Sequence, residues 1–239
     1  MAARIERAMV LAAGRGVRLG PLTDHLPKPL VPVGGIAMLD RALDALARAG
    51  VSLAVVNVHH LAAQIEARLA TREKPSIRIS REEELLETGG GIAKAISHFG
   101  AEPFFVGNAD IVWLDGRTPA LARLAEAWDD GCMDALLLLQ PVGRAIGYDG
   151  AGDFALADGG RLERRGSASS APFVFAGVQI LHPRLFAGAP AGAFSLNLLY
   201  DRARQAGRLF GLAHDGGWLH VGTMDGLAAA ERALAGKIG

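Results

Sequence analysis

The chain has 239 residues, of which 50% are hydrophobic and 21% are charged, and its 25 lysines and arginines equal its 25 aspartates and glutamates. A chain of this length can bury a substantial core, and zero net charge gives no reason to expect a nucleic-acid partner. One cysteine, Cys132, excludes an internal disulfide, and no apolar run approaches the roughly 18 residues of a membrane span, so we expect a cytoplasmic protein without a membrane partner.

The first predicted element is a buried strand over residues 8–13, which opens directly into a glycine-rich loop over residues 14–20. Glycine lets the backbone approach an anion closely and adopt positive φ, so such a loop presents backbone N–H groups to a phosphate. Arg15 and Arg18 in this loop can pair with phosphate oxygens through two parallel hydrogen bonds. The start of the chain therefore predicts a nucleotide phosphate site.

Further along, apolar runs of strand length alternate with segments of helical spacing. Strands are predicted over residues 53–58, 76–80, 104–108, 135–140, 173–180 and 209–213, and helices over residues 36–49, 61–69, 91–99, 118–128, 196–206 and 223–234. Residues 147–160 are rich in Gly and Asp and predict turns and hairpins. Because the strand runs are continuously apolar, we expect an α/β fold in which helices cover both faces of a mostly parallel sheet.

The spacing of the glycine-rich loop differs from two common phosphate-binding motifs. No Walker run G-x-x-x-x-G-K-[ST] is present here, and the third glycine of the pattern G-x-G-x-x-G falls one residue late, at Gly20. No clear acidic ribose ligand follows Val58, which also argues against a nicotinamide-dependent oxidoreductase. Pro21 and Pro27 argue against a long helix directly after the loop, because proline lacks the N–H that a helix interior needs.

Two motifs near the start of the chain carry a resemblance to a known family. The runs L-A-A-G-R-G-V-R-L from Leu11 and P-K-P-L-V-P-V from Pro27 resemble the signature of the sugar-1-phosphate nucleotidyltransferases, with the family's spacing from Arg18 to Lys28. Later motifs are most similar to the N-acetylmuramate-1-phosphate uridylyltransferase branch: L-E-T-G-G-G-I from Leu86, N-A-D from Asn108, L-H-P-R-L-F from Leu181, G-A-F-S-L from Gly192 and W-L-H-V-G-T from Trp218.

The resemblance implies a GT-A-like, Rossmann-like three-layer fold and metal-dependent transfer of UMP from UTP to N-acetylmuramic acid α-1-phosphate. The products would be UDP-MurNAc and pyrophosphate, as in peptidoglycan recycling. We expect one domain over residues 1–239, with a nucleotide-binding half over about residues 1–115 and a sugar-binding half over about residues 116–239, acting as a monomer or homodimer. Two alternatives stay open: the same chemistry on glucose, mannose or GlcNAc 1-phosphate with UTP, dTTP or GTP, and a non-catalytic nucleotide-sugar sensor.

The family's catalytic positions fall on charged residues of the matching motifs. Arg18 and Lys28 match the cations that hold the triphosphate, and Asp110 matches a ligand of Mg²⁺, with Mn²⁺ as the alternative metal, after a predicted strand. The resemblance assigns the nucleotide to a further group of residues: Ala13, Gly14, Gly16, Glu82, Glu87, Thr88 and Gly89. A carboxylate at Glu82 accepts from uracil N3–H but donates nothing, which favours uracil or thymine; the alternative for Glu82 is a solvated charge run.

The second metal position departs from the family pattern. A W-x-D-x-G-T segment normally supplies a carboxylate, and this chain has His220 there. Magnesium prefers oxygen ligands and imidazole suits softer metals, so His220 is either a metal-linked residue beside Asp110 or a structural histidine in a turn. For the sugar, the resemblance and the turn positions suggest Asn108, Asp153, Glu163, Arg164 and Gly177.

Overall fold

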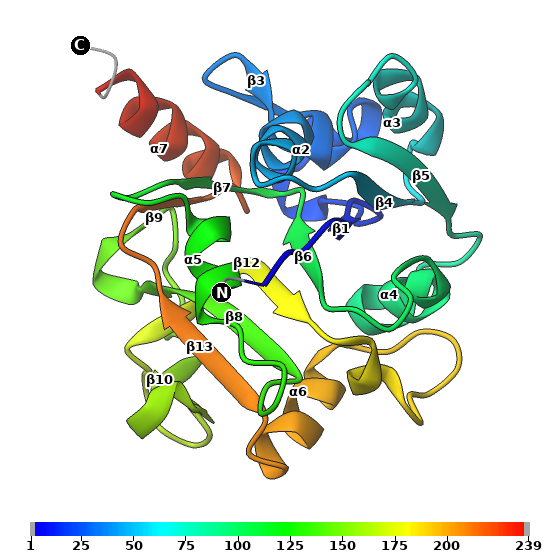
Figure 1. Cartoon of the computed structure of the whole chain (residues 1–239). Coiled ribbons are helices and arrows are strands. Elements are labelled where there is room, and N and C mark those ends of the chain that lie inside the picture. The colour runs from blue at the N-terminus through cyan, green and yellow to red at the C-terminus, as the bar shows by residue number, and fades with distance from the viewer. Residues whose placement is uncertain (1–2, 237–239) are drawn as a thin grey trace.

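A nine-stranded mixed sheet forms the centre of the molecule in the computed structural model, which describes residues 3–236 (Figure 1). Its main path runs β11-β10-β12-β6-β1-β4-β5, and β8 and β13 extend it from β12. The strands are β1 (Arg7–Leu11), β4 (Leu53–Val58), β5 (Ser76–Arg81), β6 (Phe104–Asn108), β8 (Ala135–Pro141), β10 (Phe154–Leu156), β11 (Leu162–Arg164), β12 (Phe173–Leu181) and β13 (Leu209–Ala213). Strands β6, β1, β4 and β5 are parallel, whereas β12 runs antiparallel to both β6 and β8.

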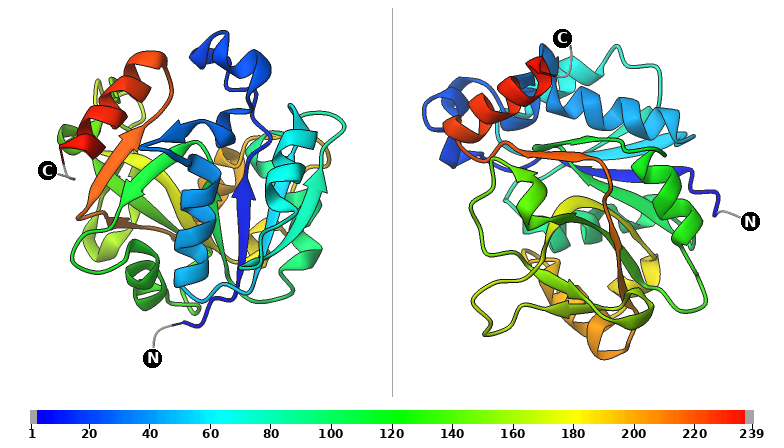
Figure 2. Two further views of the ribbon diagram at one scale, coloured as in Figure 1. Left: turned by 90° about the horizontal axis from the view of Figure 1, so that it is seen from above. Right: turned by 90° about the vertical axis from the view of Figure 1, so that its left-hand side faces the viewer.

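Helices cover both faces of this sheet, as the sequence predicts. One face carries α2 (Met38–Arg48), α3 (Ala62–Leu69) and α5 (Ala120–Ala127), and the other carries α4 (Glu87–Ala95) and α6 (Asn197–Gln205) (Figures 1 and 2). Strand β1 shows why its residues form a central strand: Ala8 and Val10 pack in the first layer, and Met9 between them packs in the second. Successive side chains of a strand point to opposite faces, so a continuous apolar run fills both layers.

A smaller three-stranded sheet lies beside the main one and carries part of the site. It consists of β7 (Ile111–Leu114), β14 (Gly217–His220) and β9 (Ala145–Ile146), and α7 (Met224–Ala235) packs against it (Figure 2). The sequence analysis did not predict these strands. Each has at most four residues, so the periodic signal is too short to identify them.

The chain between β1 and α2 is built from short elements. They are the helix α1 (Leu22–His25), 3-10 turns over Val17–Leu19 and Lys28–Leu30, and the hairpin of β2 (Pro32–Val33) and β3 (Ile36–Ala37). No long helix follows the glycine-rich loop, in agreement with the prediction from its prolines. Within residues 3–236, no helix is both long enough and apolar enough to cross a membrane.

A bulge in β12 links the two sheets. The pairing of β12 with β8 shifts register between Phe175 and Gln179, and Gly177 within this stretch has φ +75°. The Ala176 carbonyl accepts a hydrogen bond from the indole Nε1–H of Trp218 on β14 at 2.9 Å. Trp218 is 2% exposed, so this buried bond holds the smaller sheet against the main one.

Replacing Trp218 by Phe removes the donor to Ala176 and leaves a buried carbonyl unpaired, so we expect a loss of about 1–3 kcal/mol in the free energy of unfolding. Trp128→Phe is the matched control, because within residues 3–236 the buried indole N–H of Trp128 has no acceptor. Urea denaturation of both variants measures the difference. Equal losses would show that the Trp218 hydrogen bond does not stabilise the fold.

Candidate active site

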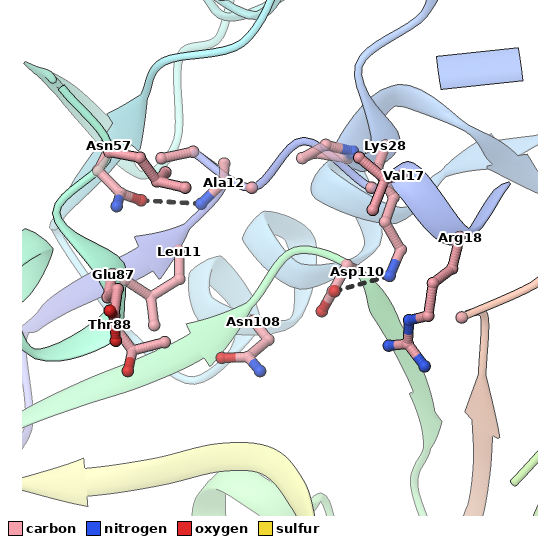
Figure 3. Close-up of a pocket in the computed structure, with 16 residues that line it drawn as sticks. Leu11, Ala12, Val17, Arg18, Lys28, Asn57, Glu87, Thr88, Asn108 and Asp110 are labelled. Atoms are coloured by element: carbon pink, nitrogen blue, oxygen red, sulfur yellow. Dashed lines mark hydrogen bonds and ion pairs between the residues drawn. The ribbon is translucent and has the colours of Figure 1, made fainter. Parts of the chain in front are cut away.

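A pocket of about 310 Å³ opens at the carboxyl ends of β1, β4 and β6 (Figure 3). Ligands of open α/β sheets collect at this edge. The lining residues are Leu11, Ala12, Ala13, Gly14, Gly16, Val17, Arg18, Lys28, Pro29, Asn57, Leu85, Glu87, Thr88, Asn108, Asp110 and Gly222. The predicted residues Ala13, Gly14, Gly16, Arg18, Lys28, Glu87, Thr88, Asn108 and Asp110 are therefore brought together in one pocket.

One end of the pocket is basic. The ammonium of Lys28 lies 2.7 Å from an Asp110 carboxylate oxygen, and the Lys28 side chain is only 7% exposed whereas that of Asp110 is 40% exposed. Arg18 lies at the same end and, among residues 3–236, has no carboxylate in ion-pair contact (Figure 3). Two cations thus face one carboxylate, and the surplus of positive charge suits a phosphate chain.

Gly16 lets the glycine-rich loop lie directly on the Lys28 side chain. Its φ is +67°, and a Cβ at this position would stand 2.7 Å from the Lys28 Cβ, so a larger residue would displace the lysine stem. The buried Thr23 hydroxyl lies 3.3 Å from the Gly16 carbonyl and 3.1 Å from that of Gly20, and can donate to either. The loop is therefore held from beneath while its outer surface stays exposed.

The opposite end of the pocket carries Leu11 and Ala12, with Glu87 and Thr88 beside them (Figure 3). Strand β1 ends here in Leu11, and the Ala12 N–H donates to the Asn57 side-chain oxygen at 2.8 Å (Figure 3). Glu82 lies behind this wall, 3% exposed, and does not line the pocket. Its two carboxylate oxygens accept from Asn57 at 2.7 Å and from the Leu86 N–H at 3.0 Å.

The start of α4 forms a third side of the pocket. Glu87 has φ +57°, a left-handed conformation that is uncommon outside glycine and is found at binding sites. The Thr88 hydroxyl accepts from the Leu196 N–H at 3.0 Å, and the Gly89 N–H donates to the Phe194 carbonyl at 2.9 Å. A Cβ on Gly89 would overlap the Phe194 ring, so Gly89 allows the loop before α6 to close on α4 rather than lining the pocket itself.

His220 ends β14 next to the basic end of the pocket. Its ring stacks on Trp218 with planes 2° apart, and its Nδ1 lies 3.2 Å from the Gly147 carbonyl. A carbonyl accepts only, so Nδ1 carries the proton and Nε2 presents its lone pair, the arrangement of many metal-binding histidines. Nε2 faces Gly222, where a Cβ would stand 2.9 Å from it, and Gly222 lines the pocket.

The charges of the basic end act on the His220 ring. Burial lowers the pKa of His220 below its ordinary value, and the positive charges of Lys28 and Arg18 lower it further. The Gly147 carbonyl and the Asp110 carboxylate raise the pKa, but their effects are smaller than that of burial. The ring is therefore neutral at neutral pH, the form that can donate a lone pair to a cation.

The predicted sugar residues are not all at the pocket. Asn108 lines it, and Gly177 lies directly behind Asn108, since a Cβ there would stand 3.2 Å from the Asn108 amide nitrogen. Asp153, Glu163 and Arg164 do not line it. Their contacts are with Phe175 N–H at 2.9 Å for Asp153, Arg204 at 3.5 Å for Glu163, and Asp201 at 2.6 Å for Arg164.

Several residues of the pocket are not predicted from the sequence. Asn57 is the most informative of them, because it is 2% exposed and holds the Ala12 N–H. A single amide within the otherwise apolar run L-A-V-V-N-V of β4 was the available signal. Val17, Leu85 and Gly222 carried no comparable signal, since each depends on loop geometry.

The chain is similar to known proteins along most of its length. A family model described as the MobA-like NTP transferase domain matches residues 8–206. The chain is 43% identical over 233 residues to the N-acetylmuramate alpha-1-phosphate uridylyltransferase of Caulobacter vibrioides, covering 95% of this chain and 96% of that protein. It is 34% identical over 235 residues to the enzyme of the same name from Neisseria meningitidis serogroup B, covering 96% of this chain and 98% of that protein.

A solved structure shows the same fold at low sequence identity. A putative glucose-1-phosphate thymidylyltransferase from Bacillus anthracis, in complex with a sucrose, superimposes with a TM-score of 0.80. The identity is 19%, and the alignment covers 96% of this chain and 94% of the other. The expectation of a GT-A-like nucleotide-sugar fold is thereby confirmed.

We expect His220 in the free protein to titrate below the ordinary histidine pKa, measured from its ring proton by NMR and assigned with a His220→Gln variant. Lys28→Met should raise this pKa, because it removes a positive neighbour, and Asp110→Asn should lower it, because it removes a negative one. A His220 pKa at or above the ordinary value, or shifts of the opposite sign, would contradict the electrostatic arrangement.

Proposed function

The chain belongs to the MobA-like NTP transferase family, and from this we propose that it transfers UMP from UTP to N-acetylmuramic acid α-1-phosphate. The products are UDP-MurNAc and pyrophosphate. The identity of 43% to a uridylyltransferase over 95% of this chain supports the choice of nucleotide and sugar. Such a reaction returns the muramyl sugar to cell-wall synthesis in peptidoglycan recycling, and we assign it to the cytoplasm.

The single observation that carries the proposal is the polarity of the pocket. Lys28 and Arg18 lie with Asp110 at one end, and Leu11 and Ala12 lie at the other (Figure 3). We place the triphosphate at the basic end and the uracil beside the small and apolar groups. We orient the α-phosphate toward Asn108 and Asp110, at and just after the end of β6, and place the attacking sugar phosphate there.

The reaction demands positioning more than covalent chemistry from the protein. An oxygen of the sugar phosphate attacks the α-phosphorus of UTP, and pyrophosphate leaves from the opposite side. Lys28 neutralises charge on the α-phosphoryl group, and Arg18 holds the β- and γ-phosphates and then the departing pyrophosphate. The backbone N–H groups of Gly14 and Gly16, which both line the pocket, would add donors that cost no reorganisation.

Asp110 and His220 are the residues that would hold a divalent cation. Among residues 3–236, no group of three or more His, Cys, Asp or Glu is arranged to bind a metal, so phosphate oxygens must complete any coordination. The partly exposed Asp110 carboxylate and the Nε2 lone pair of His220 fit that requirement. A bound Mg²⁺ or Mn²⁺ would neutralise phosphate charge, and the mixed oxygen and nitrogen donors favour Mn²⁺ relative to a site of two carboxylates.

For the sugar we propose Asn108 as the direct neighbour, with Gly177 behind it, and with Asp153, Glu163 and Arg164 contributing from β11 and the residue before β10. We place Glu87 and Thr88, which line the pocket, between the nucleotide and the sugar. We assign the nucleotide mainly to residues before about 115 and the sugar mainly to residues after it within the same domain, with Asn108 as the exception. Monomer and homodimer both fit this arrangement.

Pyrophosphate release from five nucleoside triphosphates against four sugar 1-phosphates, each with Mg²⁺ and with Mn²⁺, tests the proposal. We expect turnover with UTP and the muramyl phosphate. Turnover with glucose, mannose or GlcNAc 1-phosphate instead would keep the chemistry and change the substrate. Nucleotide binding without turnover in any combination would contradict catalysis and favour a nucleotide-sugar sensor. The observation that favours a sensor is His220 at the position where the family has a carboxylate.

Replacing Lys28 by Met should lower kcat/KM about 100-fold or more, because it removes a preorganised cation from the reacting phosphate. Lys74→Met is the control, since Lys74 is exposed and lies outside the pocket. Steady-state kinetics of both variants give the comparison. A Lys28→Met enzyme within threefold of the parent would show that Lys28 does not contact the transition state.

A further inference from the structure

A buried series of hydrogen bonds runs behind the base end of the pocket and connects three separate elements. The Ala12 N–H donates to the Asn57 side-chain oxygen at 2.8 Å, and the Asn57 amide nitrogen donates to Glu82 Oε1 at 2.7 Å. Glu82 Oε2 accepts from the Leu86 N–H at 3.0 Å. We call these four residues the buried relay; they join the end of β1, strand β4 and the loop before α4.

The carboxylate determines the direction of every bond in the buried relay. A carboxylate only accepts, so Asn57 must turn its NH₂ group toward Glu82. The Asn57 oxygen then faces the opposite way, toward Ala12, and matches the N–H there. A neutral glutamine at position 82 has only one acceptor oxygen, so it cannot accept from both Asn57 and Leu86. If its NH₂ group faces Leu86, the Leu86 N–H loses its acceptor. If it faces Asn57, the Asn57 amide must turn over, and the Ala12 N–H loses its acceptor.

Packing around the buried relay leaves its members little freedom. Glu82 is 3% exposed and Asn57 is 2% exposed. Gly91 of α4 faces both: a Cβ there would stand 2.7 Å from Glu82 Oε1 and 2.8 Å from the Asn57 amide nitrogen. The close approach of α4 therefore depends on a glycine at this position.

The two backbone groups that the buried relay holds border the pocket on two sides. Ala12 lies in the floor, and Leu86 stands between Leu85 and Glu87, which both line the wall. The adjacent Leu11 carbonyl accepts from the Ala109 N–H at 3.0 Å, directly before Asp110. The floor is thus fixed on one side to β6 and on the other, through Asn57, to Glu82.

We propose that Glu82 is a positioning residue that holds Ala12, through Asn57, and the Leu86 backbone in place at the border of the pocket, without touching the base. The inference rests on the proposed function only for the identity of the base. It departs from the sequence expectation that Glu82 itself accepts from uracil, because both carboxylate oxygens are engaged by the protein and the side chain does not line the pocket.

Glu82→Gln separates the two roles. If Glu82 is a positioning residue, its two acceptor oxygens hold Asn57 and Leu86 in place. Glutamine keeps only one acceptor oxygen, so the variant should raise the KM for UTP tenfold or more. The KM for the sugar phosphate and kcat should stay within about threefold. Direct contact with uracil predicts a different result, since a glutamine can also pair with the base and UTP binding would persist.

The double variant Asn57→Asp with Glu82→Gln is the matched test. Here the carboxylate introduced at position 57 accepts from Ala12 and from the new amide, and the amide oxygen accepts from Leu86. Every bond of the buried relay is thereby restored, with the carboxylate moved to the neighbouring member of the relay. We expect the KM for UTP to return to within about threefold of the parent. Asn57→Asp alone places two carboxylates face to face and should bind UTP poorly. Failure of the double variant to recover would overturn the proposal.

Amide hydrogen exchange gives a readout that does not depend on the reaction. Amide hydrogen exchange of Ala12 and Leu86 should be slow in the parent, faster at one of them in Glu82→Gln, and slow again in the double variant. If the parent shows no UTP turnover, the proposed function fails while this exchange pattern still decides the role of Glu82. Gly91→Ala leaves both polar side chains in place but separates them; an unchanged KM for UTP in that variant would count against the proposal.

Discussion

The contact between Lys28 and Asp110 is the interaction on which the rest of the site depends. Lys28 is almost fully buried, so its ammonium needs a partner, and the Asp110 carboxylate at 2.7 Å provides one. This pair connects the segment after the glycine-rich loop to the residues after β6, although Lys28 and Asp110 are 82 residues apart in the sequence. The carboxylate, which is 40% exposed, keeps access to the pocket. The free protein therefore already holds an ammonium and a potential metal ligand at the place where we propose that the phosphates react.

The pocket is built on rigid strand ends and completed by backbone groups. Strands β1, β4 and β6 end side by side, and hydrogen bonds from Ala109 to Leu11 and from Ala12 to Asn57 fix the floor between them. The more open part is the exposed outer surface of residues 14–20, which rests on Lys28 and Thr23. In the proposed orientation the base lies against the fixed floor and the phosphates lie against the more open loop, the division expected when a nucleotide must bind specifically and pyrophosphate must leave.

Much of the sheet could be predicted because its strands are buried on both faces and read as continuous apolar runs. The bounds of β4, β6 and β13 agree with the sequence prediction to the residue. Strands β7 and β14 could not be found, since short pairings far apart in the chain leave no local period. The inward orientation of Glu82 could not be predicted either, because Glu82 lies in the charged run R-E-E-E. Glu82 follows the buried Ser80 by two residues, and in an extended chain residues two apart point to the same side.

In the proposed function, the orientation of the nucleotide follows from the two unlike ends of one pocket. A crystal structure with a non-hydrolysable UTP analogue and Mn²⁺ tests this orientation most directly. We expect phosphates against Arg18 and Lys28, the cation on Asp110, and the uracil beside Leu11 and Ala12 with no contact to Glu82. A reversed nucleotide, with its base at Lys28 or its phosphates beside Leu11, would contradict the proposal.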